Sequence, residues 1–549
     1  MNAIEQYNEL IQSGKIPACK KLKKVYGHIV ANMHDPECSY IYNEKKANMA
    51  IDFIETFIHI PKLAGNPIFK LELWQKAFIS VIFGFVSKET GYRQYREAFL
   101  YLGRKNSKSV MSAAIANYFL ACEGDAPEIY SAATKRDQAK IIWDYAKIMV
   151  QSSPALKKHL KIRVNRIENP YTMGKFVPLS KDSDSLDGLN CSLILIDELH
   201  AIQDRNMYDV LQGGTYARKQ PLTLITSTGG YIQPDSIFET KYQEYNAIID
   251  GYTSGKYKDE AVFPCIYELD NKNEVNDEAL WIKANPNLGV SKNVELLRKE
   301  VNRARLDEKT IKDLLAKQFN LQQLSQEAFF SLDDIRNTET FDIDKLRGAY
   351  CFGGVDLSET TDLTCAVLLI VPPGSDVLYV HQMYWLPEDT LQDHIERDKA
   401  PYDKWVSAGY VRTCPGNIID QTVITQWMLE VQQQYGLYVY KIGYDRYNAQ
   451  YLTKDLQLNF GERTCEPVSQ TFRGITDAMY KSKAFFQKSR INYNYNPVFL
   501  WCLMNVQALY DNAGNVKPYK NRNLNVRIDG YSAFLDAFSV YLAHQDELG

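Results

Sequence analysis

The sequence predicts two successive α/β domains, and three features of the chain lead to this prediction. The chain has 549 residues, more than one ordinary hydrophobic core accommodates. Between residues 66 and 330, short apolar runs alternate with helix-like stretches, a pattern typical of a parallel sheet covered by helices. A second alternation begins near residue 348. We therefore expect an N-terminal helical region at 1–65, a first α/β domain at 66–330 that ends in a helical linker, and a second α/β domain at 340–549.

The elements of the first domain follow from runs of apolar residues. Near-continuous apolar runs indicate strands that are buried on both faces, as in a parallel sheet. These runs are Ala98–Leu102, Ile129–Ala133, Leu193–Ile196 and Leu222–Thr226. Between them, Gln138–Val150 is expected to be helical.

The second domain opens differently. Three consecutive strand-like runs are joined by short turns, among them Pro372-Pro373-Gly374, which fits a hairpin. The expected strands are Tyr350–Asp356, Thr364–Val371, Val377–Trp385 and, later, Val439–Asp445. The expected helices are Val423–Tyr435 and Tyr531–Ala543.

Composition excludes several classes of protein. Hydrophobic residues make up 45% and charged residues 24%, so the chain is not mainly disordered, collagenous or coiled coil. The 63 basic and 67 acidic residues give a net charge of −4, so any DNA contact must come from local basic patches. The ten cysteines form no CxxC pair, and no signal peptide or membrane-length apolar run occurs. We therefore expect a cytosolic protein with no membrane association.

The segment Gly103–Ser109 has the features of a phosphate-binding loop. It follows an expected strand and precedes a helix, where backbone N–H groups and the helix N-terminus can bind phosphate. Lys108 would neutralise the β and γ charges and Ser109 would hold Mg²⁺. The usual GxxxxGK[ST] pattern is not met, because Ser107 occupies a glycine position. A basic turn before a helix is the alternative.

An apolar strand that ends in two acids strengthens the case for a nucleotide site. Asp197 and Glu198 follow the run that begins at Ser192. A desolvated carboxylate is costly unless it is paired or bound to metal. In a nucleotide hydrolase Asp197 would organise Mg²⁺ and Glu198 would polarise the attacking water. Together with the loop, these acids predict a P-loop ATPase domain of the RecA/ASCE-like type. An ordinary strand end with solvated acids is the alternative.

Two further features fit this domain. Thr226, Ser227 and Thr228 end another apolar strand, where hydroxyls are suited to sensing the γ-phosphate and relaying hydrolysis. A simple Ser/Thr/Gly turn is the alternative. Gln75 precedes the first strand of the domain and is a candidate for contacting the adenine edge.

The second domain places acids at strand ends. Asp356 ends its first strand and Asp445 its fourth, while Asp529 and Asp536 lie at the last helix. Two-metal phosphodiester cleavage needs carboxylates that converge from separate parts of a chain. This order of acids predicts an RNase H-like nuclease with two divalent cations, Mg²⁺ or Mn²⁺. Three unrelated solvated acids are the alternative.

Two basic segments could contact a phosphate backbone. The first is Lys157–Arg163 with Arg166, and the second comprises Lys517, Lys520, Arg522 and Arg527, close to Tyr519. Both could track DNA without sequence preference. A solvated charged face is the alternative, above all for the first segment.

An ATPase followed by an RNase H-like nuclease in one chain resembles the large subunit of tailed-phage terminases. The resemblance covers nearly the whole chain, and four motifs carry it: Arg104–Ser109, Leu195–His200, the polar run Asp182–Asn190, and Asp356-Leu357-Ser358 with Asp362-Leu363-Thr364. It implies an ATP-driven motor that moves double-stranded DNA into a procapsid and an endonuclease that cuts concatemers to genome ends.

The resemblance also implies roles for residues. Arg104 would be a cis-acting arginine and Glu198 the hydrolytic base, while the segment 226–228 would couple hydrolysis to movement. Nucleotide would be bound by Gln75, Lys105, Asn106, Ser107, Lys108 and Ser109. The ATPase Mg²⁺ would be held by Asp197 and the nuclease cations by Asp356, Asp445 and Asp529, with Asp536, about two helical turns further on, as the competitor of Asp529.

The implied partners are double-stranded DNA, a portal protein and a small terminase subunit, with a pentameric ring as the working assembly. The implied location is the host cytoplasm and, transiently, the procapsid. Two other hypotheses stay open: a helicase–nuclease of DNA repair, which would need a second RecA-like lobe, and a nucleotide-regulated DNA-binding protein with a decayed nuclease domain.

Overall fold

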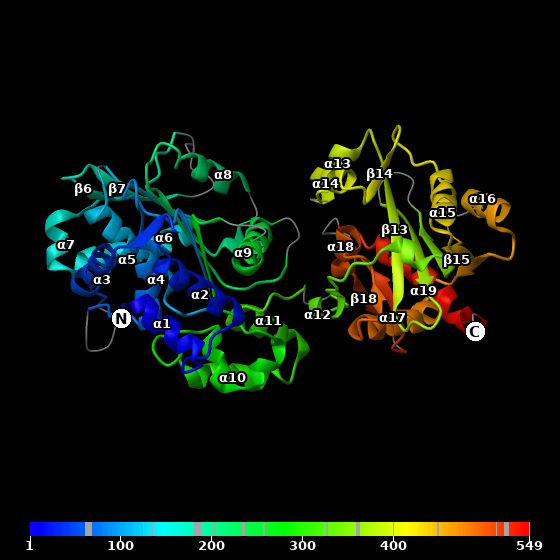
Figure 1. The fold of residues 1–549 in the computed structure, drawn as a ribbon, viewed down its shortest axis with the longest axis horizontal. Helices are drawn as coiled ribbons and strands as arrows, with labels where there is room; N and C mark the ends of the chain where they lie inside the picture. The colour runs from blue at the N-terminus through cyan, green and yellow to red at the C-terminus, as the bar shows by residue number, and fades with distance from the viewer. Residues whose placement is uncertain are drawn as a thin grey trace. The chain divides into compact units, whose positions relative to one another are not determined.

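The computed structural model divides the chain into two compact units, Met1–Gln323 and Leu324–Gly549. It describes residues 1–60, 68–124, 126–133, 136–179, 188–202, 205–232, 236–255, 259–324, 328–357, 363–398, 400–446, 450–511, 513–520 and 526–547. Each unit combines helices with a sheet that is largely parallel in unit 1 and mixed in unit 2 (Figure 1). The predicted α/β class is therefore confirmed.

Unit 1 is built on an eight-stranded sheet in the order β10-β3-β9-β8-β4-β7-β6-β5. The strands from β10 to β7 pair in parallel, and the two at the far edge are antiparallel. Because β3, β9 and β8 are neighbours that run in parallel, the carboxyl ends of these three strands lie at one edge. The bounds are β3 Glu97–Tyr101, β4 Glu128–Ala132, β5 Lys161–Ile162, β6 Ile167–Asn169, β7 Gly174–Leu179, β8 Leu193–Asp197, β9 Leu222–Ser227 and β10 Val262–Ile266.

The central strands are buried along their whole length, as expected for a parallel sheet covered on both faces. Helix α5 is largely apolar and buried, and it packs against the sheet and against α3 and α6. From residue 73 onward, the α-helices of unit 1 are α4 Leu73–Gly84, α5 Lys108–Cys122, α6 Arg136–Ser152, α7 Pro154–His159, α8 Arg205–Gly213, α9 Ile237–Ser254, α10 Val294–Ala304 and α11 Glu308–Phe319.

The N-terminal helices belong to the same compact unit as this sheet. Ile4, Tyr26 and Ile54 lie in one buried core with Phe99 of β3 and Phe263 of β10. The region predicted at 1–65 thus shares its core with the sheet. It contains α1 Ala3–Gln12, α2 Lys20–His34 and α3 Glu44–Phe57, and the strand β1 Tyr40–Tyr42 pairs with β2 Phe85–Ser87.

Unit 2 contains a mixed sheet in the order β14-β13-β12-β11-β15-β16, with β17 beside β13. Strands β11, β12 and β13 are antiparallel neighbours, whereas β15 runs parallel to β11. Asp356 and Asp445, the last residues of β11 and β15, therefore lie at the same edge. The bounds are β11 Tyr350–Asp356, β12 Thr364–Val371, β13 Leu378–Pro387, β14 Val411–Cys414, β15 Tyr438–Asp445, β16 Cys465–Val468, β17 Ile491–Asn492, β18 Gln507–Tyr510 and β19 Val516–Tyr519.

The last helix packs across the centre of this sheet. Helix α19, Asp529–His544, contacts β11, β12 and β15 (Figure 1). Gly354 and Gly443 allow the close approach, because a Cβ at Gly354 would lie 2.0 Å from Ala533 O and one at Gly443 2.4 Å from Asp536 O. The other helices are α12 Leu332–Ile335, α13 Leu391–Asp398, α14 Tyr402–Ser407, α15 Thr422–Tyr435, α16 Gln450–Phe460, α17 Phe472–Gln487 and α18 Pro497–Asn505.

Throughout the described ranges, each helix is too short or too polar to cross a lipid bilayer.

Candidate active sites

The phosphate-loop candidate lies between β3 and α5. Lys105 and Ser107 adopt left-handed backbone conformations, with φ of 66° and 64°. Alternating handedness of this kind turns successive N–H groups toward one side and makes a concave anion-binding surface. The side chains of Arg104 and Lys105 are exposed, whereas Asn106 is fully buried. The local geometry is that of a loop that holds phosphate at a helix N-terminus.

Lys108, the first residue of α5, is a buried cation. Its Nζ donates to Leu102 O at 3.2 Å and lies 3.9 Å from Glu198 Oε1. Burial lowers the pKa of Lys108, while the negative charges of Glu198 and Asp197 oppose that shift. A bound triphosphate would compensate this charge more fully than the present contacts do.

Ser109 and Asp197 come together at the carboxyl edge of the sheet. Ser109 Oγ donates to Asp197 Oδ2 at 2.8 Å, and Thr226 Oγ1 donates to Asp197 Oδ1 at 2.6 Å. Burial, and then the neighbouring charge of Glu198, raise the pKa of Asp197. A hydroxyl and a buried carboxylate side by side are the oxygen donors that Mg²⁺ takes in nucleotide sites, so these residues fit that ion.

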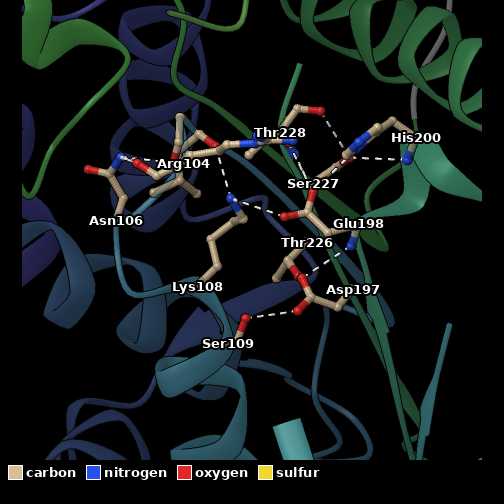
Figure 2. A network of polar contacts seen from close by, with 12 residues as sticks. Arg104, Asn106, Lys108, Ser109, Asp197, Glu198, His200, Thr226, Ser227 and Thr228 are labelled. Atoms are coloured by element: carbon tan, nitrogen blue, oxygen red, sulfur yellow. Dashed lines mark hydrogen bonds and ion pairs between the residues drawn. The ribbon is translucent and has the colours of Figure 1, made fainter. Parts of the chain in front are cut away.

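Glu198 lies at the centre of the polar network in Figure 2. Its backbone is left-handed, with φ of 53°. Its Oε2 accepts from Thr228 Oγ1 at 3.0 Å and lies 3.2 Å from His200 Nδ1. Burial alone would raise the pKa of Glu198, but the hydrogen bond from His200 and the charge of Lys108 outweigh it and lower the pKa to about 2. Glu198 is therefore a carboxylate at neutral pH.

The hydroxyl residues at the end of β9 contact both acids. Thr226 contacts Asp197 and Thr228 contacts Glu198, as described above, while Ser227 Oγ lies 3.1 Å from His200 Nδ1. Figure 2 shows these side chains in one network of polar contacts with Asp197, Glu198 and His200. The strand that carries them is bonded to β3 on one side and to β8 on the other.

Gln75 is placed differently from the other nucleotide candidates. It is buried on α4, where its Oε1 accepts from Glu72 N at 2.9 Å as part of a helix cap. Within the described ranges its Nε2 has no hydrogen-bond partner. Among the described residues no hydrogen bond joins Gln75 to the loop, although its neighbour Trp74 is connected to the loop through Asn287.

In unit 2, Asp356 and Asp529 line one cleft of about 550 Å³ together with Lys517, Tyr519 and Lys520. Burial, then the charges of Asp529 and Asp536, raise the pKa of Asp356 well above its usual range, while Ser532 hydrogen-bonds to it. Like-charged carboxylates that are kept from water need a counter-charge. Their oxygen donors fit hard divalent cations such as Mg²⁺ or Mn²⁺.

Asp445 and Asp536 form the other end of this acidic region. Asp445 is exposed at the end of β15, while Asp536 is buried on α19 and accepts from Gln470 Nε2 at 2.7 Å. Burial, and to a smaller extent Asp445, raise the pKa of Asp536. Over the part of the chain that the structure describes, no three His, Cys, Asp or Glu side chains already form a metal-binding group.

Several residues that belong to the motifs predicted from the sequence lie outside the described ranges. They are residues 182–187, Ser358, Asp362 and Arg522.

Three residues at the phosphate loop were not predicted from the sequence. Asn285, Asn287 and Lys292, here called the Asn–Lys cluster, are all buried and hydrogen-bonded to the loop or to one another. Asn285-Pro286-Asn287 has the composition of an ordinary turn, so no local signal in the sequence marks it as part of a site. His200 is a further contact of Glu198 to which the sequence assigned no role.

Comparison with known proteins gives two family matches. The family described as "Terminase large subunit, ATPase domain" matches residues 73–247, and "Terminase large subunit, endonuclease domain" matches residues 256–545, more than half of the chain. The chain is 26% identical over 504 residues to the "Terminase, large subunit" of Enterobacteria phage HK97, covering 89% of this chain and 94% of that one.

A second relative is the "Terminase large subunit" of Lactococcus phage p2, 21% identical over 489 residues, which are 87% of this chain and 88% of that one. Among solved structures, the large terminase of bacteriophage HK97 aligns with 90% of this chain and 99% of its own, at 23% identity and a TM-score of 0.47.

Proposed function

The chain belongs to the terminase large subunit family and joins an ATPase domain to an endonuclease domain that act in DNA packaging, and we propose how its residues divide this work. The observation that carries the proposal is the meeting of Lys108, Ser109 and the acid pair at one edge of the unit 1 sheet. These residues come from separate segments, and each supplies a different requirement of nucleotide hydrolysis.

In the ATPase, the loop 104–109 binds the triphosphate, with Lys108 against its β and γ charges. Ser109 and Asp197 hold Mg²⁺, which when bound neutralises charge that develops on the phosphates. Glu198 accepts the proton of the attacking water. Arg104, exposed in the loop, stabilises the transition state, and Gln75 contacts the adenine.

Coupling is assigned to the end of β9. Thr226 touches the Mg²⁺-binding acid and Thr228 touches the general base. A change of charge at either acid therefore alters the hydrogen bonds at the end of β9. The chain continues from there into Gly229, whose N–H donates to Asn320 Oδ1 at 2.8 Å. In this way a structural change caused by hydrolysis is transmitted to Asn320, which directly follows α11.

In the nuclease, Asp356, Asp445 and Asp529 hold two divalent cations, Mg²⁺ or Mn²⁺, with Asp536 as the competitor for the third position. The cations, when bound, stabilise the attacking and leaving oxygens of the scissile phosphodiester. The hairpin β18–β19 carries Lys517 and Lys520 on the wall of the same cleft, where they bind the DNA backbone.

The working assembly is proposed to be a pentameric ring that docks on a portal protein in the host cytoplasm and on the procapsid. A small terminase subunit supplies the DNA. Support comes from the family alone. Sedimentation of the chain with and without portal rings tests it, and a chain that never associates with portal overturns it.

Two substitutions separate the activities. Lys108→Ala is expected to abolish ATP hydrolysis and leave metal-dependent plasmid nicking, because the two sites lie in different units. Asp356→Ala is expected to do the reverse. Lys299→Ala and Asp403→Ala, at exposed positions of α10 and α14, are matched controls. If both activities survive both changes, the residue assignment is wrong.

A further inference from the structure

The Asn–Lys cluster lies in a segment that follows the unit 1 sheet and returns to the phosphate loop. The exposed fractions are 0% for Asn285, 2% for Asn287 and 6% for Lys292. Polar groups buried to this degree are hydrogen-bonded in folded proteins, and their partners show what they hold in place. Here both asparagines have partners in the loop, and Lys292 is connected to the loop through Asn285, so the cluster supports the nucleotide site.

Asn287 contacts two places at once. Its main-chain N–H donates to Asn106 Oδ1 at 3.0 Å, and its Nδ2 donates to Ser107 Oγ at 3.3 Å. Its Oδ1 accepts from Trp74 Nε1 at 2.7 Å. Trp74 precedes Gln75 on α4, so the Asn287 side chain connects the helix that carries the adenine candidate to the phosphate loop.

Asn285 supports the start of the loop. Its Oδ1 accepts from Asn106 Nδ2 at 3.0 Å, and Asn106 Nδ2 also donates to Gly103 O at 2.8 Å. A Cβ at Gly103 would lie 2.4 Å from Asn285 Oδ1, so glycine is required by this close contact. Gly103 N also donates to Ala284 O at 2.9 Å.

Lys292 ties this arrangement to α11. Its Nζ donates to Asn285 Oδ1 at 2.5 Å and to Gln318 Oε1 at 2.6 Å. Burial lowers the pKa of Lys292 to about 7; Glu300 opposes the shift and Lys108 adds to it. Through Asn285, which Asn106 of the loop also contacts, Lys292 connects the phosphate loop to Gln318 of α11.

We propose that Asn287, with Asn285 and Lys292, forms a set of positioning residues that hold the phosphate loop in its nucleotide-binding conformation and tie it to the adenine end of the site. This rests on the proposed nucleotide site. The cluster falls within residues 256–545, which match the endonuclease-domain family, yet it belongs to unit 1 and contacts the ATPase loop. A terminase truncated before residue 284 would therefore lack part of its nucleotide site.

The test compares Asn287→Ala with Asn117→Ala in the full chain. Asn117 is an equally buried asparagine on α5 that donates to Ala146 O, away from the loop. Loss of buried hydrogen bonds at Asn287 is expected to weaken binding of a fluorescent ATP analogue about ten-fold. Asn117→Ala is expected to lower Tm to a similar extent and leave nucleotide affinity unchanged. Equal affinity losses in the two variants would overturn the proposal.

Trp74→Phe provides a second measurement that does not depend on the folding of the first variant. It removes the donor to Asn287 Oδ1 and makes the buried ring smaller, but it leaves the loop unchanged, so the affinity for ATP is expected to fall while that for inorganic triphosphate stays the same. Asn287→Ala is expected to weaken both. An unchanged ATP affinity in Trp74→Phe contradicts the link between the two ends of the site.

Lys108→Ala is measured in parallel. If Lys108→Ala still binds and hydrolyses ATP, the proposed nucleotide site itself fails. If Lys108→Ala fails to hydrolyse ATP but Asn287→Ala behaves as the wild type, only the positioning role fails.

Discussion

Ser109 Oγ lies 2.8 Å from Asp197 Oδ2, although the two residues are 88 positions apart in the chain. The contact exists because β3 and β8 both end at the same edge of the sheet, with β9 between them. It brings a hydroxyl at a helix N-terminus to a carboxylate at a strand end, and a nucleotide-bound Mg²⁺ needs both.

Replacement of Glu198 by Gln should stop hydrolysis without preventing nucleotide binding. Gln keeps the shape and can still contact His200 and Thr228, but it cannot accept the proton of water. We expect kcat for ATP to fall about a hundredfold or more. Steady-state ATPase assays and analogue binding measure the two effects; a variant that keeps wild-type kcat would remove Glu198 from the mechanism.

Ser107 occupies a left-handed position that favours glycine, with φ of 64°. Ser107→Gly relieves strain of about 1 kcal/mol but loses the hydrogen bond from Asn287, worth about 1 kcal/mol. Its Tm is therefore expected to stay near that of the wild type. Ser107→Val adds a β-branched side chain at positive φ and loses the same bond, so both Tm and ATP affinity should fall. Equal Tm values for the two variants would contradict this account of the loop.

Asp529 and Asp536 can be separated as nuclease ligands. Asp529 lines the same cleft as Asp356, whereas Asp536 is not among the residues that line it and accepts a hydrogen bond from Gln470. Asp529→Asn is therefore expected to abolish Mn²⁺-dependent nicking and remove a calorimetric Mn²⁺-binding event. Asp536→Asn should reduce nicking less. The opposite order of losses assigns the third ligand to Asp536.

Gly354 should be intolerant of any side chain, unlike its neighbour Gly353. A Cβ at Gly354 would meet Ala533 O at 2.0 Å and Ala537 N at 2.5 Å, both backbone atoms of α19. At Gly353 the nearest atom is Ile442 Cγ1 at 3.0 Å, which can move. We expect Gly354→Ala to cost unit 2 about 3 kcal/mol or more and Gly353→Ala about 1 kcal/mol. Urea unfolding followed by tryptophan fluorescence measures both, and nicking should be lost only in Gly354→Ala.

The pKa of Lys292 predicts how stability depends on pH. Its folded-state pKa of about 7 lies below the usual 10.5, so the unfolded chain binds more protons between these values. Stability of unit 1 should therefore rise with pH through that window. Lys292→Met removes the titrating amine, so its stability does not rise with pH in this way. The difference in free energy of unfolding, variant minus wild type, should therefore be largest below pH 7 and decrease as pH rises. Lys299→Met, at an exposed site, should show no such trend.

Much of the molecule could be predicted from residues that are neighbours in the sequence. Tyr350–Asp356 and Thr364–Val371 are strands with the expected bounds. The α/β class, the family and the two activities are confirmed by the sheets and the family matches. Strands and the motifs at their ends have local signatures, because burial of a parallel strand needs a continuous apolar run.

The roles of individual acids and the support of the loop could not be predicted in this way. Asp529 and Asp536 are seven residues apart on one helix, and a sequence does not say which of them faces a cleft. Asn285 and Asn287 lie about 180 residues from Asn106 and Ser107, to which they are bonded.

The sequence by itself therefore determined the order of the domains and the chemistry of each, because these depend on runs of apolar residues and on adjacent side chains. Only the tertiary structure decided which buried polar groups meet across long stretches of chain. Such contacts depend on the order and pairing of strands and on the path of the segments between them, and these arise when distant segments bury their surfaces together.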